Sequence, residues 1–186
     1  MKFEGTLDVV IDEIRSVLSG VTDESIEELS GSILKAKRVF LFAMGRSGLA
    51  IKAFAMRLMH LGLKVHVVGE VTSPSLGEGD LLIVGSASGE TPSVVLNSKK
   101  ARKVGAGIVA ITASKESTVA GLSDMVITVP TKTPKVPDRA GVSSVQPMGN
   151  LFEQSLLILT DIIVMNLMER LSIDSEMMFK NHANLE

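Results

Sequence analysis

One stretch organises this chain, Leu81-Leu82-Ile83-Val84-Gly85-Ser86-Ala87-Ser88-Gly89-Glu90-Thr91-Pro92-Ser93. Four apolar residues end at a glycine, hydroxyl side chains then gather around Gly89, and Pro92 opens a run that is compatible with a helix. The pattern predicts a buried strand, a small loop and a helix with Pro at its first position. Such a loop directs backbone N–H groups, hydroxyls and a helix N-terminus at one point, which favours an anion, most naturally phosphate.

Two interpretations of this loop are open. The loop holds no Lys or Arg, so in a phosphate site the helix dipole would have to supply the positive field. In the alternative, residues 86–91 are an ordinary connection between a strand and a helix, and Thr91 is only the N-cap of that helix.

Length and composition indicate a soluble globular protein with one core. The net charge of −2 and the aromatic content of 3% argue against nucleic acid and anionic membranes as partners. The absence of Cys fits a cytoplasmic location, and the N-terminus lacks the apolar segment of a signal peptide. The longest uninterrupted apolar run, near Leu156 to Leu159, is too short to span a bilayer. No His, Asp and Glu cluster has metal-ligand spacing, so no metal is expected.

The hydrophobic pattern predicts an α/β fold. Residues 6–36 show the spacing of two amphipathic cover helices. Further helices are expected at 49–61, 92–104 and 151–171, and a short helix or turn at 118–122. Buried strands are expected at 38–45, 64–69, 81–85, 107–112 and 125–129. Because these strands are continuously apolar and alternate with helices, we predict a doubly wound, five-stranded parallel sheet with helices on both faces, in the flavodoxin-like order 2-1-3-4-5.

This strand order places the first and third strands side by side. The loops that follow them, Gly45-Arg46-Ser47-Gly48 and residues 86–91, then meet at the point where the strand order reverses. Ser47 is either a ligand of phosphate or sugar, or an N-cap, and the two roles are compatible. Arg46 either pairs with the ligand or faces solvent.

Residues 131–149 form a long predicted loop at the same edge of the sheet. The loop carries the cations Lys132, Lys135 and Arg139. Loops at this edge are often functional, although a solvated connection fits the composition equally well.

Glu153 follows Asn150 at the start of the helix predicted for 151–171. In one interpretation, Asn150 is the N-cap and Glu153 completes a capping box. In the other, Glu153 is a general base, because its helical face is otherwise apolar and would partly desolvate the carboxylate. The spacing leaves both interpretations open.

The chain has three histidines. His66 alternates within a predicted strand and is interpreted as structural. His60 lies near the end of the helix predicted for 49–61, about 20 Å of helical rise from Ser47, so it is better placed to serve a neighbouring subunit's site than its own. His182 lies in the C-terminal tail, which can reach either site.

Surplus apolar surface predicts assembly. The helix at 151–171 is apolar on more than one face, and the helix at 49–61 is rich in Met. One face can pack on the sheet, and the rest is expected to be buried against another subunit. We therefore predict a homo-oligomer, a tetramer of two-fold pairs, with sites completed across an interface by His60, His182 or both.

The stretch Ser86-Ala87-Ser88-Gly89-Glu90-Thr91 resembles the Ser-x-Ser-Gly-x-Thr signature of sugar isomerase (SIS) domains. The order of predicted elements is similar to that of an SIS domain over nearly the whole chain. Within this family the chain resembles the 6-phospho-3-hexuloisomerases, and that resemblance rests on residues 45–48, 56–62, 146–149, 152–154 and 182–186.

The resemblance implies a single SIS domain over residues 1–186. It implies an isomerase that interconverts D-arabino-hex-3-ulose 6-phosphate and fructose 6-phosphate through an enediol, in the formaldehyde-fixing ribulose monophosphate pathway. Such enzymes are metal-independent and commonly tetrameric, and the reaction requires no redox cofactor. Two alternatives remain, another aldose–ketose phosphosugar isomerase and a phosphosugar-binding regulatory protein without turnover.

The resemblance also implies roles for individual residues. It makes Glu153 the base that moves the proton, with His60 and His182 as the candidates that assist proton transfer to the oxygens. It assigns the phosphate and the sugar to the two loops at the switch point, through Gly45, Arg46, Ser47, Ser86, Ser88, Gly89 and Thr91.

Overall fold

The computed structural model describes residues 3–132 and 141–185, which form a parallel sheet covered by helices. The sheet has the order β2-β1-β3-β4-β5, as predicted. Its strands are β1 (Val39–Ala43), β2 (Val65–Val67), β3 (Leu81–Ser86), β4 (Gly107–Thr112) and β5 (Met125–Thr128). The helices are α1 (Phe3–Leu18), α2 (Asp23–Lys35), α3 (Gly45–His60), α4 (Pro92–Lys103), α5 (Thr118–Leu122), α6 (Asn150–Leu171) and α7 (Ser175–Phe179).

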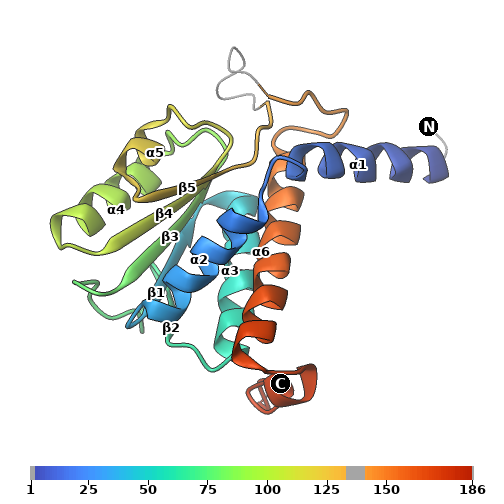
Figure 1. The fold of residues 1–186 in the computed structure, drawn as a ribbon. Helices are drawn as coiled ribbons and strands as arrows, with labels where there is room; N and C mark the ends of the chain where they lie inside the picture. Colours follow the sequence, from blue (N-terminus) through green and yellow to red (C-terminus); the bar gives the residue numbers. More distant parts are fainter. Residues whose placement is uncertain (1–2, 133–140, 186) are drawn as a thin grey trace.

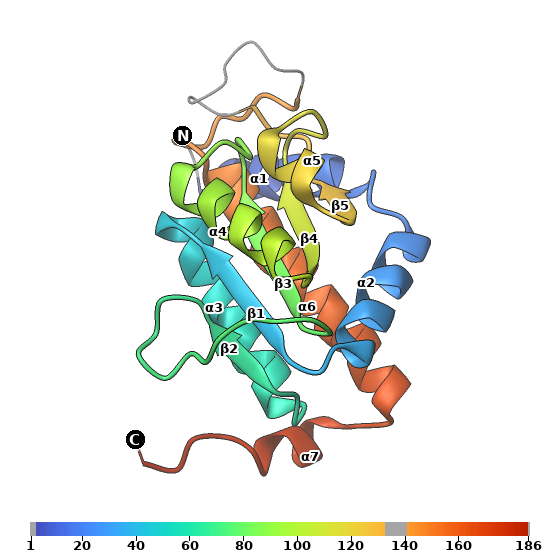
Figure 2. The ribbon, with the colours of Figure 1, turned by 90° about the vertical axis from the view of Figure 1, so that its left-hand side faces the viewer.

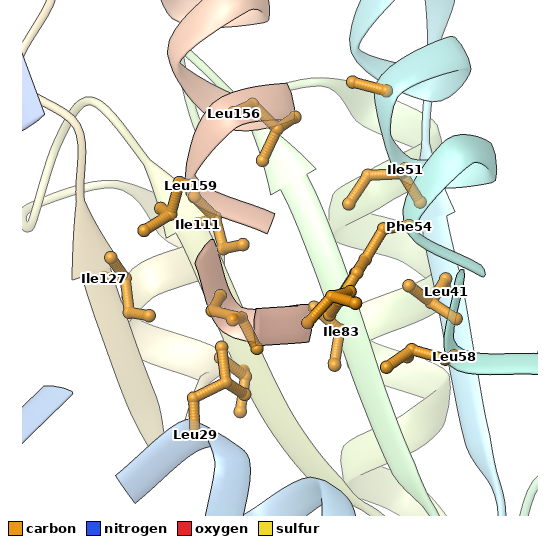
Figure 3. Close-up of a cluster of buried hydrophobic side chains, with 14 of the residues drawn as sticks. Leu29, Leu41, Ile51, Phe54, Leu58, Ile83, Ile111, Ile127, Leu156 and Leu159 are labelled. Carbon is orange, nitrogen blue, oxygen red and sulfur yellow. The ribbon is translucent and has the colours of Figure 1, made fainter. Parts of the chain in front are cut away.

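Helices cover both faces of the sheet, because its central strands are apolar on both sides (Figure 1). α4 and α5 pack on one face, over a cluster that includes Phe40, Leu82 and Ile108. α2, α3 and α6 pack on the other, over a larger cluster. Figure 3 shows its centre, where Phe54 of α3 and Leu156 of α6 point towards the sheet. The predicted doubly wound architecture is confirmed.

The start of α3 differs from the prediction. Residues 45–48, expected to be a loop, form the first turn of α3, which begins at Gly45 rather than at residue 49. Gly45 adopts φ +61°, a left-handed backbone conformation that is unfavourable for residues with a Cβ atom. Gly48 passes so close to the end of β1 that a Cβ atom there would lie 2.9 Å from the carbonyl oxygen of Ala43. Two glycines therefore let the chain turn from β1 into α3 without an intervening loop.

One helix in the described ranges, α6, is long and apolar enough to cross a membrane by length and composition. The uninterrupted apolar run near Leu156 is too short to indicate this, because charged and polar residues interrupt the apolar positions of the helix. Half of the apolar window is buried within the protein, where α6 packs against α1, α2 and α3. Its fully buried side chains, such as Leu156 and Ile163, belong to the main core, which is the pattern of a core helix.

The long segment between β5 and α6 is only partly described. Lys132 pairs through its backbone with Val142, whereas the predicted cations Lys135 and Arg139 lie outside the described residues. From Val142 the chain passes over α1 and enters α6, so α1 lies across the N-terminal end of α6 in Figures 1 and 2.

Candidate functional site

A pocket of about 400 Å³ opens at the carboxyl ends of β1 and β3. These strands pair directly, with Ala43 opposite Gly85, and the strand order reverses between them. Three helices begin at this pocket: the first turn of α3, Thr91 before α4, and Asn150 of α6 all line it. Because each helix N-terminus carries a partial positive charge, the pocket is suited to an anion although Arg46 is its only cationic side chain among the described lining residues.

The loop after β3 presents its hydroxyls to the pocket. Ser86, Ser88 and Thr91 all line the cavity, and the first two are nearly completely buried. The Ser86 Oγ atom accepts a hydrogen bond from the Gly89 N–H and lies 3.0 Å from the Thr91 hydroxyl. Thr91 occupies the N-cap position of α4 but makes no side-chain capping bond. Thr91 is thus the N-cap by position, as one interpretation expected, but its hydroxyl is turned to Ser86 and the pocket instead of capping the helix.

Gly89 shapes this loop without lining the pocket. Its φ of +64° lies in the left-handed region, and a Cβ atom built there would fall on the Ser117 side chain. The loop packs against the start of α5, where the Val119 N–H also donates to the Gly89 carbonyl. Glycine is thus required at this position for both conformation and space.

Ser47 lies inside the first turn of α3, and the N-cap position belongs to Met44. The N-cap interpretation of Ser47 is therefore wrong. A hydroxyl in the first turn of a helix still faces an anion at the N-terminus, and Ser47 lines the pocket together with Gly45 and Arg46.

Glu153 does not form the capping box. The N-cap of α6 is Gly149 rather than Asn150, and it has no side-chain capping bond. The Glu153 carboxylate instead accepts a hydrogen bond from the Nε atom of Arg46 at 2.6 Å. Asn150 contributes in another way, because its Oδ1 atom accepts from the Nη2 atom of the same arginine at 2.6 Å. The pocket therefore contains a carboxylate paired with a guanidinium that is itself held in place.

His60 and His182 lie together, but at a second cavity of about 340 Å³ rather than at the first pocket. Their rings stack with centroids 5.3 Å apart, and Phe179 stacks on His182. Burial, together with the charges of Arg57 and His182, lowers the pKa of His60 below its ordinary value, so the imidazole is neutral at neutral pH. The third histidine, His66, lies on β2 beside the Phe40 ring.

The loop over residues 131–149 was predicted at this edge of the sheet, but none of its residues was assigned to the site, and its end forms the wall of the pocket opposite the hydroxyl loop. Pro147, Met148 and Gly149 line the cavity just before α6. Met148 adopts φ +54°, an uncommon conformation for a residue other than Gly, and such residues cluster at functional sites. No local pattern indicates this conformation, since the strain depends on the contacts that hold the segment.

Comparisons with known proteins agree with this geometry. The sequence matches the SIS domain family over residues 32–158. It is 41% identical over 177 residues to the 3-hexulose-6-phosphate isomerase of Bacillus subtilis (strain 168), covering 95% of each chain. It is 40% identical over 180 residues to the 3-hexulose-6-phosphate isomerase of Mycobacterium gastri, covering 97% of this chain and 89% of the relative.

A solved structure is similar over the full length as well. A crystal structure from Methanococcus jannaschii, for which a molecular function of 3-hexulose-6-phosphate isomerase was inferred, matches with a TM-score of 0.84 and 36% identity. The match covers 98% of this chain and 99% of the other. The parallel sheet, the hydroxyl-rich loop at the switch point and the matched region together define an SIS domain, and the chain belongs to this family. Within it, relatives that it covers almost from end to end include the 3-hexulose-6-phosphate isomerases of these two bacteria.

Proposed function

We propose that this protein is a 3-hexulose-6-phosphate isomerase, which interconverts D-arabino-hex-3-ulose 6-phosphate and fructose 6-phosphate. One observation carries the proposal: a single pocket combines a hydroxyl-rich loop among three helix N-termini with one carboxylate, Glu153, as the only acidic side chain among the described lining residues. The first part suits a phosphate group, and the second suits a proton transfer at carbon. The near full-length relatives of the same name support the assignment.

The phosphate group is assigned to the loop after β3 and to the first turn of α3. Ser86, Ser88 and Thr91 offer hydroxyl groups, and Ser47 offers a fourth from the facing helix. These groups are remote from the reacting carbons, so their binding energy serves to orient the sugar. Gly45 and Gly89 shape the backbone that presents them.

Glu153 is proposed as the base. Moving a carbonyl group between C3 and C2 requires removal of a proton from one of these carbons and its return to the other, through an enediol. A single carboxylate on one face of the sugar can perform both transfers. Arg46, whose side chain is 65% exposed, pairs with this carboxylate and can also face the oxygens on which negative charge develops.

The oxygens of the enediol require proton transfers of their own, for which we propose His60 and His182 of a neighbouring subunit. Both rings belong to the second cavity, at the other end of α3 from the pocket. His60 begins the reaction as a neutral imidazole, which can accept a proton, because burial and the charge of Arg57 lower its pKa.

A homo-oligomer, with a tetramer as the expected form, is part of the proposal. α3 and α6 pack side by side and expose large apolar residues, which are Leu49, Met56 and Met59 on α3 and Leu157, Ile158, Ile162 and Met165 on α6. A shallow groove of about 280 Å³ runs between the two helices beside Arg46 and Glu153. Burial of these side chains against a second copy removes apolar surface from water next to the site. We place the enzyme in the cytoplasm, with which its lack of Cys is consistent.

The test is an assay of the purified protein with three substrates. Turnover of 3-hexulose 6-phosphate and of fructose 6-phosphate, without turnover of arabinose 5-phosphate, supports the proposal. Turnover of arabinose 5-phosphate alone indicates an aldose–ketose isomerase instead. Binding of fructose 6-phosphate without any turnover indicates a regulatory SIS protein and contradicts the proposal.

A further inference from the structure

Glu13 of α1 holds three consecutive residues of the segment that leads to the pocket. Its Oε2 atom accepts hydrogen bonds from the Ser144 hydroxyl at 2.6 Å and from the Gln146 side-chain amide at 2.9 Å. Its Oε1 atom accepts from the Val145 backbone N–H at 2.8 Å. A carboxylate with three donors from residues 144–146 restrains both the backbone and the side chains of that segment.

A chain of hydrogen bonds leads from Glu13 to the proposed base. Beyond the bond to Glu13, Gln146 accepts from the Nδ2 atom of Asn150 at 2.9 Å. Asn150 in turn accepts from Arg46, and Arg46 donates to Glu153, both at 2.6 Å. These five residues come from α1, the segment before α6, α6 itself and α3, and the two ends of the chain of bonds are both carboxylates.

The direction of these bonds follows from Arg46, which can only donate, and from ionised Glu13, which can only accept. Arginine can only donate, so the oxygen of Asn150 must face Arg46 and its NH₂ group must face Gln146. The oxygen of Gln146 therefore faces Asn150, which leaves its NH₂ group for an acceptor. Ionised Glu13 is that acceptor. Without it, the Gln146 amide loses the acceptor of its NH₂ group, so Gln146 can move away and Asn150 and Arg46 lose one of the contacts that hold them in place.

The same segment forms the wall of the pocket. Residues 147–149 line the cavity, and Met148 is held at φ +54° within it. A residue other than glycine keeps such a conformation only where its surroundings hold it. The three bonds to Glu13 immediately before Pro147 are part of those surroundings.

We propose that Glu13 is a positioning residue of the site: it orders residues 144–149 and, through Gln146 and Asn150, orients Arg46 and Glu153. The inference rests on the proposed function, because the positioned groups are those assigned to the reaction. Glu13 is not among the residues that line the pocket, and its effect is on the geometry of the groups that are. The helix α1, which was predicted only to cover the core, therefore also carries a residue that positions the site.

The first test replaces Glu13 and a neighbouring carboxylate in separate variants. E13A is expected to lower kcat about tenfold with KM changed less than threefold, since small displacements of reacting groups affect the rate strongly. E13Q keeps the shape but places an NH₂ group against one of the three donors, so its kcat is expected between that of E13A and the wild type. The control is D12A, whose carboxylate pairs only with Arg15 of the same helix among the described contacts and is expected to retain wild-type kcat.

The second test separates positioning from general stability. Q146A removes the next link, so the effect of E13A on kcat should be clearly smaller in the Q146A background, as expected when two residues act in part through one another. If the two effects on kcat multiply, or if E13A retains kcat within twofold of the wild type, the proposal is overturned. A melting temperature for each variant shows whether the fold is intact.

A third measurement keeps this proposal distinct from the proposed function. If the wild-type protein fails to isomerise 3-hexulose 6-phosphate, the proposed function fails, and amide hydrogen exchange still decides the role of Glu13. E13A should accelerate exchange in peptides spanning 144–153 and leave those of β3 and β4 unchanged. Equal exchange in wild type and E13A over 144–153 would overturn the ordering role whatever the reaction.

Discussion

The Nε atom of Arg46 lies 2.6 Å from the Oε2 atom of Glu153, although the two residues are 107 positions apart in the sequence. The pair joins the first turn of α3 to the first turn of α6 at the edge of the pocket. The Glu153 side chain is 21% exposed, so substrate and solvent can reach it. This pairing connects the proposed phosphate site to the proposed base.

Replacement of Glu153 tests the base directly. Glu153→Gln keeps the shape of the side chain and removes the basic oxygen, so kcat should fall by at least about 100-fold. The melting temperature should change little, because the capping box that would have made Glu153 structural is not formed and the pair with Arg46 is exposed to solvent. A large loss of stability with retained turnover would assign Glu153 to the fold instead.

Removal of the loop hydroxyls tests the phosphate site. Ser86→Ala and Thr91→Ala should each raise KM for the phosphorylated substrate, since a hydrogen bond to a charged group contributes about 1.5–3 kcal/mol. Both residues line the pocket and contact each other. The double variant should therefore lose less binding free energy for the substrate than the two single variants lose together. Steady-state kinetics with fructose 6-phosphate provides the measurement, and unchanged KM in both variants would exclude this loop as the phosphate site.

Gly89→Ala tests the shape of the same loop. The methyl group would fall on Ser117 and the backbone would remain at φ +64°, so the variant should lose about 1–3 kcal/mol of stability and bind fructose 6-phosphate more weakly. Gly121→Ala in α5 is the matched control, because a Cβ atom there meets nothing within 4 Å. Chemical denaturation of the two variants side by side measures the difference, and equal stability would mean that the loop can relax.

Mixed oligomers test the role of the histidines. His60→Ala and Glu153→Gln proteins, each nearly inactive, should regain partial activity when co-refolded, because some sites then receive both wild-type groups from different subunits. Light scattering at micromolar concentration should show an oligomer. A monomer would exclude the assembly, whereas an oligomer without complementation would exclude only His60 as a residue of the neighbouring site.

Acid should weaken the fold through a partly buried ion pair. Asp80, 3% exposed, accepts hydrogen bonds from Arg38 at 3.0 and 2.6 Å and from the Gly77 N–H at 2.8 Å. The Arg38 hydrogen bonds outweigh burial and hold the pKa of Asp80 below its ordinary value of 3.8. A lowered carboxyl pKa stabilises the folded state above the ordinary value, and this contribution is lost as the pH falls through the lowered one.

The matching variant is Asp80→Asn, which should lower the free energy of unfolding by about 2 kcal/mol at pH 7. Its deficit relative to the wild type should shrink as the pH is lowered below about 4. Melting temperatures recorded from pH 7 to pH 3 test this, and a deficit that stays constant over that range would rule out the ion pair as its source. Asp12→Asn, in an exposed pair with Arg15, should differ from the wild type by less than about 0.5 kcal/mol.

The sequence by itself determined the sheet and the place of the hydroxyl-rich loop at its edge. Continuous apolar runs that end at glycines predict buried parallel strands, and the hydroxyl run from Ser86 to Thr91 before Pro92 predicts an anion loop at a helix start. These features depend on burial and on backbone groups within a few residues of each other, so they are visible in a local pattern. The family resemblance rested on the same residues, and the comparisons confirm it.

Only the tertiary structure decided which distant side chains meet. Spacing left open whether Glu153 caps the start of its own helix or acts as a base, whereas the fold pairs it with Arg46 of another helix. Glu13 looked like any polar residue of an amphipathic cover helix, because nothing in its own segment indicates that the donors of residues 144–146 lie beside it. The partners of Glu13 and Glu153 depend on how α1, α3 and α6 are placed relative to one another. That placement follows from the packing of the whole core and not from any local pattern.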